Sequence, residues 1–307
     1  MAALTALLRN PGTLRRLALA SLIANIGIVV TGGAVRLTGS GLGCPTWPRC
    51  SNGSYTTTPA LGIHGVVEFS NRTLSFVLGL LALLVVVSVA LQAERGTRLT
   101  ISSVTVLASI PAQAVVGGIT VLTKLNPWVV SCHFLFSIVV ITAAYIAWRE
   151  TTRTAGDPAP VSPATLRLHR LVLPAAALTI AVGAIVTASG PHAGDAHARR
   201  TGLDPAVVSR VHSALVLILV CLTIAVWRSA RNTHPGAGRA ALVLLCVEAA
   251  QGVVGVVQSL TNLPGVLVGV HMLGSCLVWV AALALRDELH GPAVASSDLN
   301  LTPATTP

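Results

Sequence analysis

Long apolar stretches alternate with short polar ones along the whole chain. A helix needs roughly 20 apolar residues to cross about 30 Å of hydrocarbon. Eight stretches of that kind, nearly free of charge, begin near Leu17, Thr73, Leu99, Leu125, Leu171, Val211, Ala240 and Val266. The pattern therefore predicts an all-α integral membrane protein with eight transmembrane helices.

Composition supports this interpretation. Of the 307 residues, 53% are hydrophobic and only 10% are charged, whereas a soluble domain carries roughly 25% charged residues. The segment before the first apolar run is basic, as in a signal peptide, but the run lacks a convincing small-residue cleavage site. We therefore expect this run to be retained as the first span.

The basic residues indicate an orientation, because translocated loops are poor in lysine and arginine. With the N-terminus inside, 13 of the 20 basic residues are cytoplasmic, and the outer seven are Arg36, Arg49, Arg72, Lys124, Arg199, Arg200 and Arg210. We therefore expect a multi-pass protein of the cell (plasma) membrane with both termini cytoplasmic. The net charge of +10 then reflects topology and attraction to anionic lipid, and it does not indicate a nucleic-acid partner.

An internal repeat joins two distant parts of the chain. The segments PAQAVVGGITVLTKLNPWVVSCHFL and EAAQGVVGVVQSLTNLPGVLVGVHML superimpose at an offset of 138 residues, which pairs Gln113 with Gln251, Gly117 with Gly255, and His133 with His271. A weaker match pairs the TGSG of 38–41 with the TASG of 187–190. Each half of the chain is therefore expected to hold four helices.

The repeat also predicts the domain organisation. We expect an N-terminal four-helix half at 1–147, a polar, proline-rich cytoplasmic linker at 148–170, a C-terminal four-helix half at 171–286, and a disordered cytoplasmic tail at 287–307. Because four is an even number, both halves have the same orientation in the membrane. They are expected to form two homologous four-helix bundles related by a pseudo-two-fold axis along the membrane normal.

Three histidines, His133, His212 and His271, begin the fourth, sixth and eighth spans, near the predicted outer face. A single such histidine is more often a hydrogen-bonded core residue than a ligand, but ionisable groups at membrane depth tend to be kept for function. His212 and His271 project from two helices of one half, which suits an iron porphyrin between facing imidazoles. A zinc site would need further nitrogen or sulfur ligands nearby, so haem is the best-fitting cofactor.

The N-terminal half carries a modified version of this site. Aligning SNRTLSFVLGL with RVHSALVLILV places Asn71 opposite His212, and Glu68, one turn before Asn71, opposite Ser209. One interpretation of Glu68 is an interfacial ion pair with Arg72, four residues on, which would contribute little. The other is a carboxylate beside a substrate haem, with Arg72 available to bind a propionate.

These features together resemble the haem A synthase family. The resemblance rests on eight spans in two halves, the outer loop RLTGSGLGCPTWPRC, the ExxxR motif from Glu68 to Arg72, and the histidines that open even-numbered spans. It implies oxidation of the C8 methyl of haem O to a formyl group by successive hydroxylations. It also implies a permanent haem b on His212 and His271, a substrate haem facing His133, and catalysis by Glu68.

One residue departs from the family pattern, which has a histidine where this chain has Asn71. Either His64, two turns away on the same helix face, supplies the missing ligand, or His133 alone holds the substrate iron and leaves one face open. Both alternatives stay open at the level of sequence.

Cys44 and Cys50 flank PTWPR in the predicted outer loop. A disulfide can persist in an oxidising compartment, so we expect the two cysteines to be bonded, either as a staple that folds the loop over the substrate haem or as a redox-active pair.

Other polar residues in the chain have simpler interpretations. Glu248 lies inside the seventh span, and the first half of the chain has no acidic residue at the equivalent position. We expect Glu248 to be a hydrogen-bonded or proton-handling residue. Five histidines in polar segments are expected to be solvated: His169, His192, His197, His234 and His290.

A membrane b-type cytochrome with two haems that only relays electrons is the alternative function, although it would not need Glu68 or the cysteine loop. The expected partners are haem O and the lipid bilayer. An association with the protohaem farnesyltransferase that makes haem O follows from pathway logic alone, and a homo-oligomer is compatible with the sequence. The sequence does not identify the electron donor.

Overall fold

The computed structural model describes residues 2–93, 96–153 and 161–290, and within these ranges the regular secondary structure is helical. The elements are α1 (Ala2–Arg9), α2 (Pro11–Leu37), the 3-10 helix η1 (Pro59–Leu61), α3 (Gly62–Ala90), α4 (Thr97–Leu122), α5 (Pro127–Glu150), α6 (Pro163–Ser189), α7 (Pro205–Ala230), α8 (Pro235–Leu260) and α9 (Gly265–His290). Helices α2 to α9 give 8 candidate membrane spans by length and hydropathy. The predicted all-α membrane protein with eight spans is confirmed.

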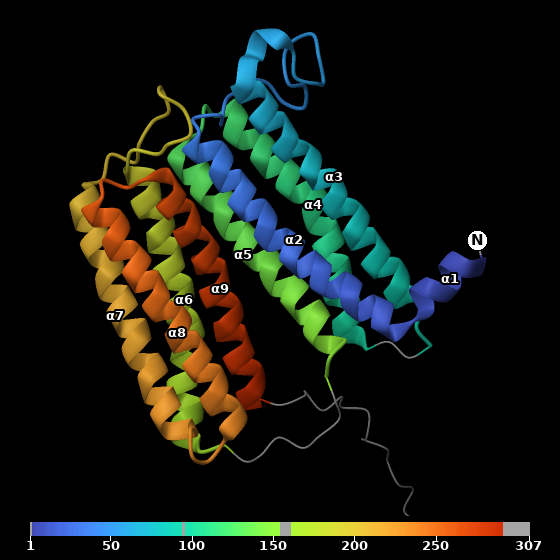
Figure 1. Cartoon of the computed structure of the whole chain (residues 1–307), viewed down its shortest axis with the longest axis vertical. Coiled ribbons are helices and arrows are strands. Elements are labelled where there is room, and N and C mark those ends of the chain that lie inside the picture. Colours follow the sequence, from blue (N-terminus) through green and yellow to red (C-terminus); the bar gives the residue numbers. More distant parts are fainter. Residues whose placement is uncertain (1, 94–95, 154–160, 291–307) are drawn as a thin grey trace, which may run out of the picture.

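The helices pack in chain order. Helices α2 to α5 lie together in one group and α6 to α9 in another, and the groups meet through α2, α5, α6 and α9 (Figure 1). One hydrophobic cluster crosses this boundary, since it contains Ile141 and Tyr145 from α5, Ile180 from α6 and Cys276 from α9. The two groups therefore share a continuous core.

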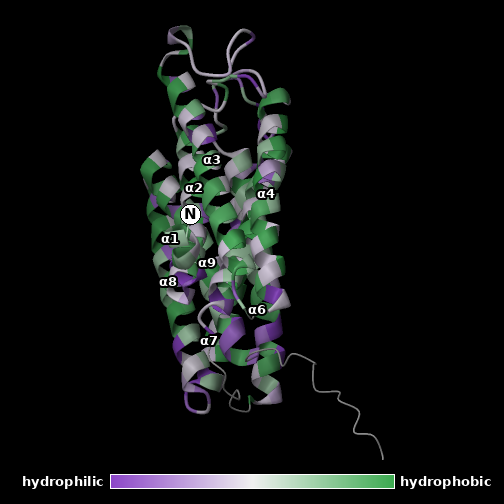
Figure 2. Cartoon of the chain, turned by 90° about the vertical axis from the view of Figure 1, so that its right-hand side faces the viewer, coloured by the Kyte–Doolittle hydropathy of each residue, from purple (hydrophilic) through white to green (hydrophobic). Residues whose placement is uncertain are grey.

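The outward faces of the helices are apolar. Phe76, Leu217, Val253 and Val266 are 79%, 66%, 64% and 80% exposed, and hydrophobic residues, drawn in green, predominate along the helices in Figure 2. Water would make such exposure costly, whereas lipid tails solvate these side chains. The surface pattern thus agrees with a helix bundle surrounded by bilayer.

Proline and capping side chains define where several helices begin. Helices α2, α5, α6, α7 and α8 each have proline in the first turn, where its missing N–H costs nothing. The Asn10, Asn126, Ser162 and Asp204 side chains accept hydrogen bonds from first-turn amides. We call the end with loops 38–61 and 190–204 the disulfide end, and the end where α5 stops and α6 starts the opposite end (Figure 1).

Several helices extend further than the sequence pattern predicts. Helix α3 begins at Gly62, well before the charge-free stretch that starts near Thr73, and Glu68 lies on this helix, as its spacing from Asn71 predicts. Helix α5 continues to Glu150 and α6 begins at Pro163, which shortens the predicted linker at 148–170. Helix α9 includes 287–290, which we had placed in a disordered tail. The remainder of that tail, 291–307, and linker residues 154–160 lie outside the described residues.

Polar contacts explain the longer α9. Asp287 accepts from Tyr145 Oη at 3.2 Å and pairs with Arg149 at 3.4 Å and Arg153 at 3.8 Å. These contacts hold the last turn of α9 against α5, across the boundary between the two helix groups.

We expect Asp287→Asn to lower the thermal stability of the purified protein. The Asp287 side chain is only 7% exposed, and the substitution removes the negative charge that it presents to Arg149 and Arg153. Loss of a hydrogen bond to a charged group costs about 1.5–3 kcal/mol. Thermal unfolding in detergent measures the effect. Glu288→Gln is the control, because the Glu288 side chain is 39% exposed and lies 3.8 Å from Arg149. Equal melting temperatures for both variants would contradict the prediction.

Candidate functional site

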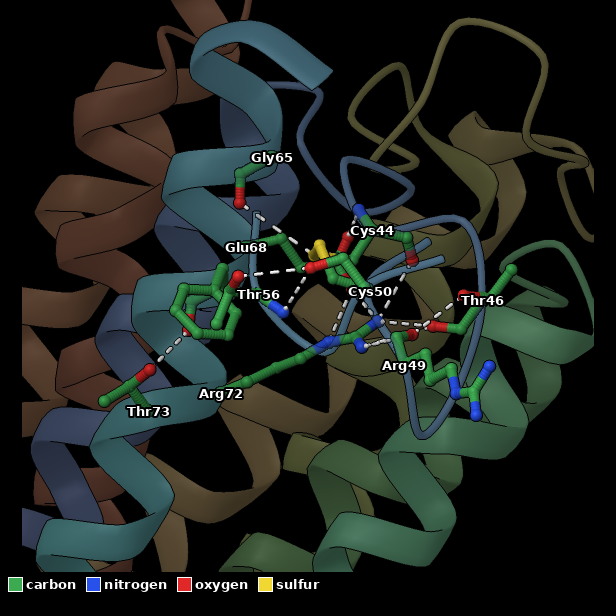
Figure 3. The surroundings of a disulfide bond; sticks show 11 residues. Cys44, Thr46, Arg49, Cys50, Thr56, Gly65, Glu68, Arg72 and Thr73 are labelled. Atoms are coloured by element: carbon green, nitrogen blue, oxygen red, sulfur yellow. Dashed lines mark hydrogen bonds and ion pairs between the residues drawn. A yellow bond between two sulfur atoms is a disulfide. The ribbon is translucent and has the colours of Figure 1, made fainter. Parts of the chain in front are cut away.

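Glu68 is buried at the disulfide end, where α3 lies beneath the loop of residues 38–58 (Figure 3). Its Oε2 accepts from the Cys44 main-chain N–H at 2.7 Å, and its Oε1 accepts from Arg72 Nη2 at 2.6 Å and Nε at 3.1 Å. The residue is only 6% exposed. These charge-assisted hydrogen bonds replace the water that a carboxylate otherwise needs.

Arg72 also holds the loop itself. Its guanidinium donates to the main-chain carbonyl of Cys44 at 3.0 Å, of Thr46 at 3.2 Å and of Arg49 at 3.4 Å, as well as to Glu68 (Figure 3). The ion pair expected from the four-residue spacing is therefore present, and it is part of a larger anchor. The predicted propionate contact of Arg72 is a separate hypothesis, because here the guanidinium points at the loop.

The predicted disulfide between Cys44 and Cys50 is present, with both cysteines fully buried. Gly43 lies so close to the backbone of His64 that a Cβ at this position would overlap it. Only glycine permits this approach of the loop to α3. The loop is thus attached to α3 in two ways. Gly43 packs against the backbone of His64, and Arg72 binds main-chain carbonyls between Cys44 and Cys50.

The loop also reaches α4 through Trp47. The Trp47 indole lies directly on Gly118, where a Cβ would overlap the ring, and the neighbouring Gly117 faces the His133 imidazole. Trp47 therefore lies next to the helix segment that packs against His133. The candidate site in this half combines α3, α4, α5 and the loop.

His133 lies on α5, with its ring against Gly117 of α4: a Cβ there would be 3.4 Å from His133 Cε1. Its Nδ1 is buried and has no hydrogen-bond partner among the described residues. A buried ring nitrogen without a partner is costly, so His133 is available for a ligand or for a further hydrogen bond.

Asn71 and His64 point in different directions. Asn71 Oδ1 accepts from Thr31 Oγ1 of α2 at 2.7 Å. His64 is exposed, and its Nδ1 lies 2.9 Å from Ser40 Oγ in the loop. The structure thus joins Asn71 to α2 and His64 to the loop.

In the second helix group, His212 of α7 and His271 of α9 face each other, with ring centroids 6.5 Å apart and ring planes 75° apart. His212 Nδ1 lies 3.1 Å from the Thr179 carbonyl, and His271 Nδ1 is buried without a partner in the described part of the chain. Both rings pack against glycine: a Cβ at Gly183 would lie 3.0 Å from His212 Cε1, and one at Gly255 would lie 3.5 Å from His271 Cε1.

Glu248 is buried on α8, and its Oε1 accepts from Thr223 Oγ1 at 2.8 Å. Its Oε2 has no hydrogen-bond partner in the regions that the structure describes. The hydrogen-bonded interpretation of Glu248 thus has a defined partner, and proton handling stays a prediction.

The prediction that five histidines are solvated is wrong for His169 and His234, which are 2% and 9% exposed. Helix α6 begins six residues before His169, and the His169 ring packs 5.2 Å from that of His290. His234 caps α8 by accepting from the Ala237 amide. His169 lies within α6 and His234 directly precedes α8, and hydropathy does not reveal their burial because helix ends are polar.

Sequence reasoning also missed Arg36, which joins the two helix groups at the disulfide end. It donates to the carbonyls of His192 at 2.5 Å and Thr187 at 3.0 Å, while the Gly41 amide donates to the Gly194 carbonyl at 2.8 Å. His192 is half-buried, and burial, followed by the charges of Arg36 and Arg200, lowers its pKa. The only sequence signal for this contact was an arginine on the predicted outer side.

We expect Arg72→Leu to loosen the loop. Each hydrogen bond lost to a charged group is worth about 1.5–3 kcal/mol, so transient opening should become about tenfold more frequent or more. The measurement is the rate at which a mild external reductant exposes Cys44 and Cys50 to thiol labelling. Arg49→Leu is the control, since Arg49 is an exposed residue of the same loop whose guanidinium donates to Asn52 and stacks on Tyr55 rather than contacting α3. Equal labelling rates for both variants would refute the role of Arg72.

The comparisons with known proteins identify the family of the chain. Residues 15–199, more than half of the chain, match the family described as cytochrome oxidase assembly protein, COX15-CtaA. The chain is also 28% identical over 127 residues to a heme A synthase from Bacillus licheniformis, an alignment that covers 41% of this chain and 41% of that protein. The resemblance to haem A synthases is thus confirmed, and the chain belongs to the COX15-CtaA family of cytochrome oxidase assembly proteins.

Proposed function

We propose that this protein is a haem A synthase that oxidises the C8 methyl group of haem O to a formyl group. The observation that carries the proposal is an asymmetry between two similar sites. One half has two facing histidines, whereas the other has His133 on α5 and a buried carboxylate, Glu68, on α3, which is bonded to the disulfide loop. A protein that only relayed electrons would have no use for this carboxylate.

The two halves are proposed to be homologous four-helix bundles, 1–147 and 171–286, related by a pseudo-two-fold axis along the membrane normal. Helix α2 packs on α9 as α6 packs on α5. The turns that precede α5 and α9 also match, because Lys124 and Leu125 have φ of 54° and 57° and Asn262 and Leu263 have φ of 60° and 57°. Left-handed backbone is rare for residues other than glycine, so its recurrence at the repeat spacing supports a common origin.

The C-terminal half is proposed to hold haem b on His212 and His271. Imidazole nitrogens bind metals at about 2 Å, and the ring centroid lies about 1 Å further out, so two axial imidazoles should have centroids about 6 Å apart. The observed 6.5 Å fits this requirement. The 75° between the ring planes would not prevent the two imidazoles from holding one haem b, whose iron would supply electron transfer.

In the N-terminal half, the substrate haem O is proposed to be held by His133, with one face of its iron free of protein ligands. Asn71 is bonded to Thr31, and His64 is bonded to Ser40 of the loop. These contacts favour the interpretation with one histidine over the one in which His64 replaces the missing ligand. An open face suits an oxygen-derived reactant or water.

The residues around Glu68 have defined roles in this proposal. The iron porphyrin supplies the redox chemistry. Two successive hydroxylations of the methyl group, each a two-electron oxidation of carbon that needs an external oxidant such as dioxygen, give a geminal diol, which loses water to leave the aldehyde. Glu68 orients water or takes up the proton released at the methyl carbon, while Arg72 and the Cys44 amide hold the carboxylate in place. The loop carrying Trp47 limits the access of bulk water.

The disulfide end is proposed to face the outside of the cell membrane, with both termini cytoplasmic. An even number of spans puts the two ends of the helical region on one side, and the basic residues are more numerous on the opposite end. Haem O is the proposed substrate, and the protohaem farnesyltransferase that makes it is a proposed partner.

We expect Glu68→Gln to abolish most haem A formation while haem b is retained. Loss of a general acid or base costs about 10²–10⁴-fold in rate, and the C-terminal half lies elsewhere. The measurement is chromatography of haems extracted from protein purified from aerobic cells that make haem O. Ser209→Ala is the matched control, because Ser209 aligns with Glu68 and is exposed.

Two results would contradict this proposal. Haem b alone in the wild-type protein would favour the electron relay, and undiminished haem A in Glu68→Gln would remove Glu68 from the chemistry.

We also expect Gly183→Ala to weaken haem b retention more than Gly255→Ala. The new methyl group at 183 would lie 3.0 Å from His212 Cε1, closer than ordinary contact, whereas the one at 255 would lie 3.5 Å from His271 Cε1. Displacing a metal ligand from its supporting shell typically costs about 10–100-fold in affinity. Haem b content after detergent washing measures the difference. Equal losses from the two variants would count against ligation by His212 in the observed orientation.

A further inference from the structure

Each of the three histidines packs on a glycine of the preceding helix, and a hydrogen-bond acceptor lies four residues before that glycine. The pattern is complete for His212. Its ring packs on Gly183, and its Nδ1 lies 3.1 Å from the carbonyl oxygen of Thr179, four residues before Gly183. Residues four apart on a helix lie on the same face, so the glycine makes room for the ring and the carbonyl orients it.

For His133 and His271, the residue four positions before the glycine is a glutamine. His133 packs on Gly117, four residues after Gln113, and His271 packs on Gly255, four residues after Gln251. His133 Nδ1, His271 Nδ1, Gln113 Oε1 and Gln251 Oε1 are all buried, and none has a hydrogen-bond partner among the described residues. A donor and an acceptor, both buried and both unpaired, therefore recur at equivalent positions of the repeat.

The glutamine side chains already lie close to the histidine helices. Gln113 Nε2 donates to Ser137 Oγ at 2.9 Å, and Ser137 donates in turn to the His133 main-chain carbonyl at 3.2 Å. The Gln251 amide lies so close to Gly274, three residues after His271, that a Cβ there would overlap it. Each amide is thus within about one helical turn of its histidine.

We propose that Gln113 and Gln251 are positioning residues whose side-chain oxygens accept a hydrogen bond from Nδ1–H of His133 and His271 when haem is bound. This inference rests on the proposed function, because it assumes that the other ring nitrogen, Nε2, faces iron. For His271, whose Nδ1 lies on the side of the ring that faces Gly255, the hydrogen bond requires a rotation of the glutamine side chain. For His133, whose Nε2 lies on the side that faces Gly117, it also requires the ring to turn. His212 shows the completed arrangement with the Thr179 carbonyl.

The hydrogen bond has a chemical consequence beyond geometry. Metal-bound histidines almost always donate their other ring N–H to a carbonyl or carboxylate, which fixes the tautomer and raises ligand basicity. A more basic imidazole stabilises ferric over ferrous iron and lowers the midpoint potential. Gln251 should therefore tune haem b, and Gln113 should tune the binding of haem O.

Gln258 is a competing acceptor for His271. It lies three residues after Gly255 on α8, and its Oε1 is also buried and unpaired within the described ranges. Its counterpart in the N-terminal half is Thr120, which donates to the Gly117 carbonyl, so it does not share the repeated pattern. The repeat favours Gln251, and Gln258 provides a control of the same chemistry on the same helix.

The test uses the full-length protein purified with its haem, in the variants Gln251→Leu, Gln251→Glu, Gln258→Leu and Gln113→Leu. Haem b midpoint potential is measured by spectroscopic redox titration, and haem b retention by washing. Gln251→Leu should weaken retention about 10–100-fold and raise the potential, by about 59 mV for each tenfold loss of ferric over ferrous affinity. Gln251→Glu, which keeps an acceptor oxygen, should restore a low potential.

The other variants separate the alternatives. Gln258→Leu and Gln113→Leu should leave the haem b potential unchanged, while Gln113→Leu weakens haem O binding. An unchanged potential in Gln251→Leu, or the same shift in Gln258→Leu, would overturn the assignment. Should Gln251→Leu fail to fold, Gln251→Asn, whose shorter amide cannot reach as far, gives the same readout. Wild-type protein purified without haem would instead overturn the proposed function, and this inference with it.

Discussion

A carboxylate buried at the end of an apolar helix bundle is shielded from water, so the protein must supply its hydrogen-bond donors. Glu68 receives them from the loop that covers it and from Arg72. The Cys44 amide and the Arg72 guanidinium satisfy its two oxygens, and Arg72 binds three carbonyls of the same loop. The disulfide closes that loop between Cys44 and Cys50, and the Trp47 ring packs on Gly118 of α4. The position of the carboxylate is therefore a property of α3, α4 and the loop together.

The proposed duplication of a helix bundle, followed by change in one copy, would account for the two different sites. The turns before α5 and α9 share a left-handed pair of residues, and the Leu125 and Leu263 amides each donate at 2.8 Å to a carbonyl five residues back. This shared frame starts the helices of His133 and His271 alike, although the side of the ring that faces the neighbouring glycine carries Nε2 in His133 and Nδ1 in His271. The copies differ on α3 and α7, where Asn71 bonded to α2 stands in place of His212.

The family match and the geometry contribute to different halves of the molecule. Residues 15–199 include Glu68, Arg72 and His133 but end before α7, which begins at Pro205. The proposed haem b ligands therefore rest on the facing rings of His212 and His271 and on the repeat. Gly183 faces the His212 ring and Gly255 faces the His271 ring. These glycines support the proposed ligation, because a bulky residue at either position would leave no room for the imidazole between closely packed helices.

The sequence by itself determined the eight spans, the repeat, the disulfide pair and the four-residue spacing of Glu68 and Arg72, because hydropathy and helical periodicity are local properties of the chain. It missed the true ends of α5 and α9 and the burial of His169 and His234, since polar helix ends resemble loops. Only the tertiary structure decided that Glu68 binds Cys44, that Asn71 faces α2 and that His212 faces His271. Those contacts join residues 24 or more positions apart, so they depend on how whole helices rotate and pack.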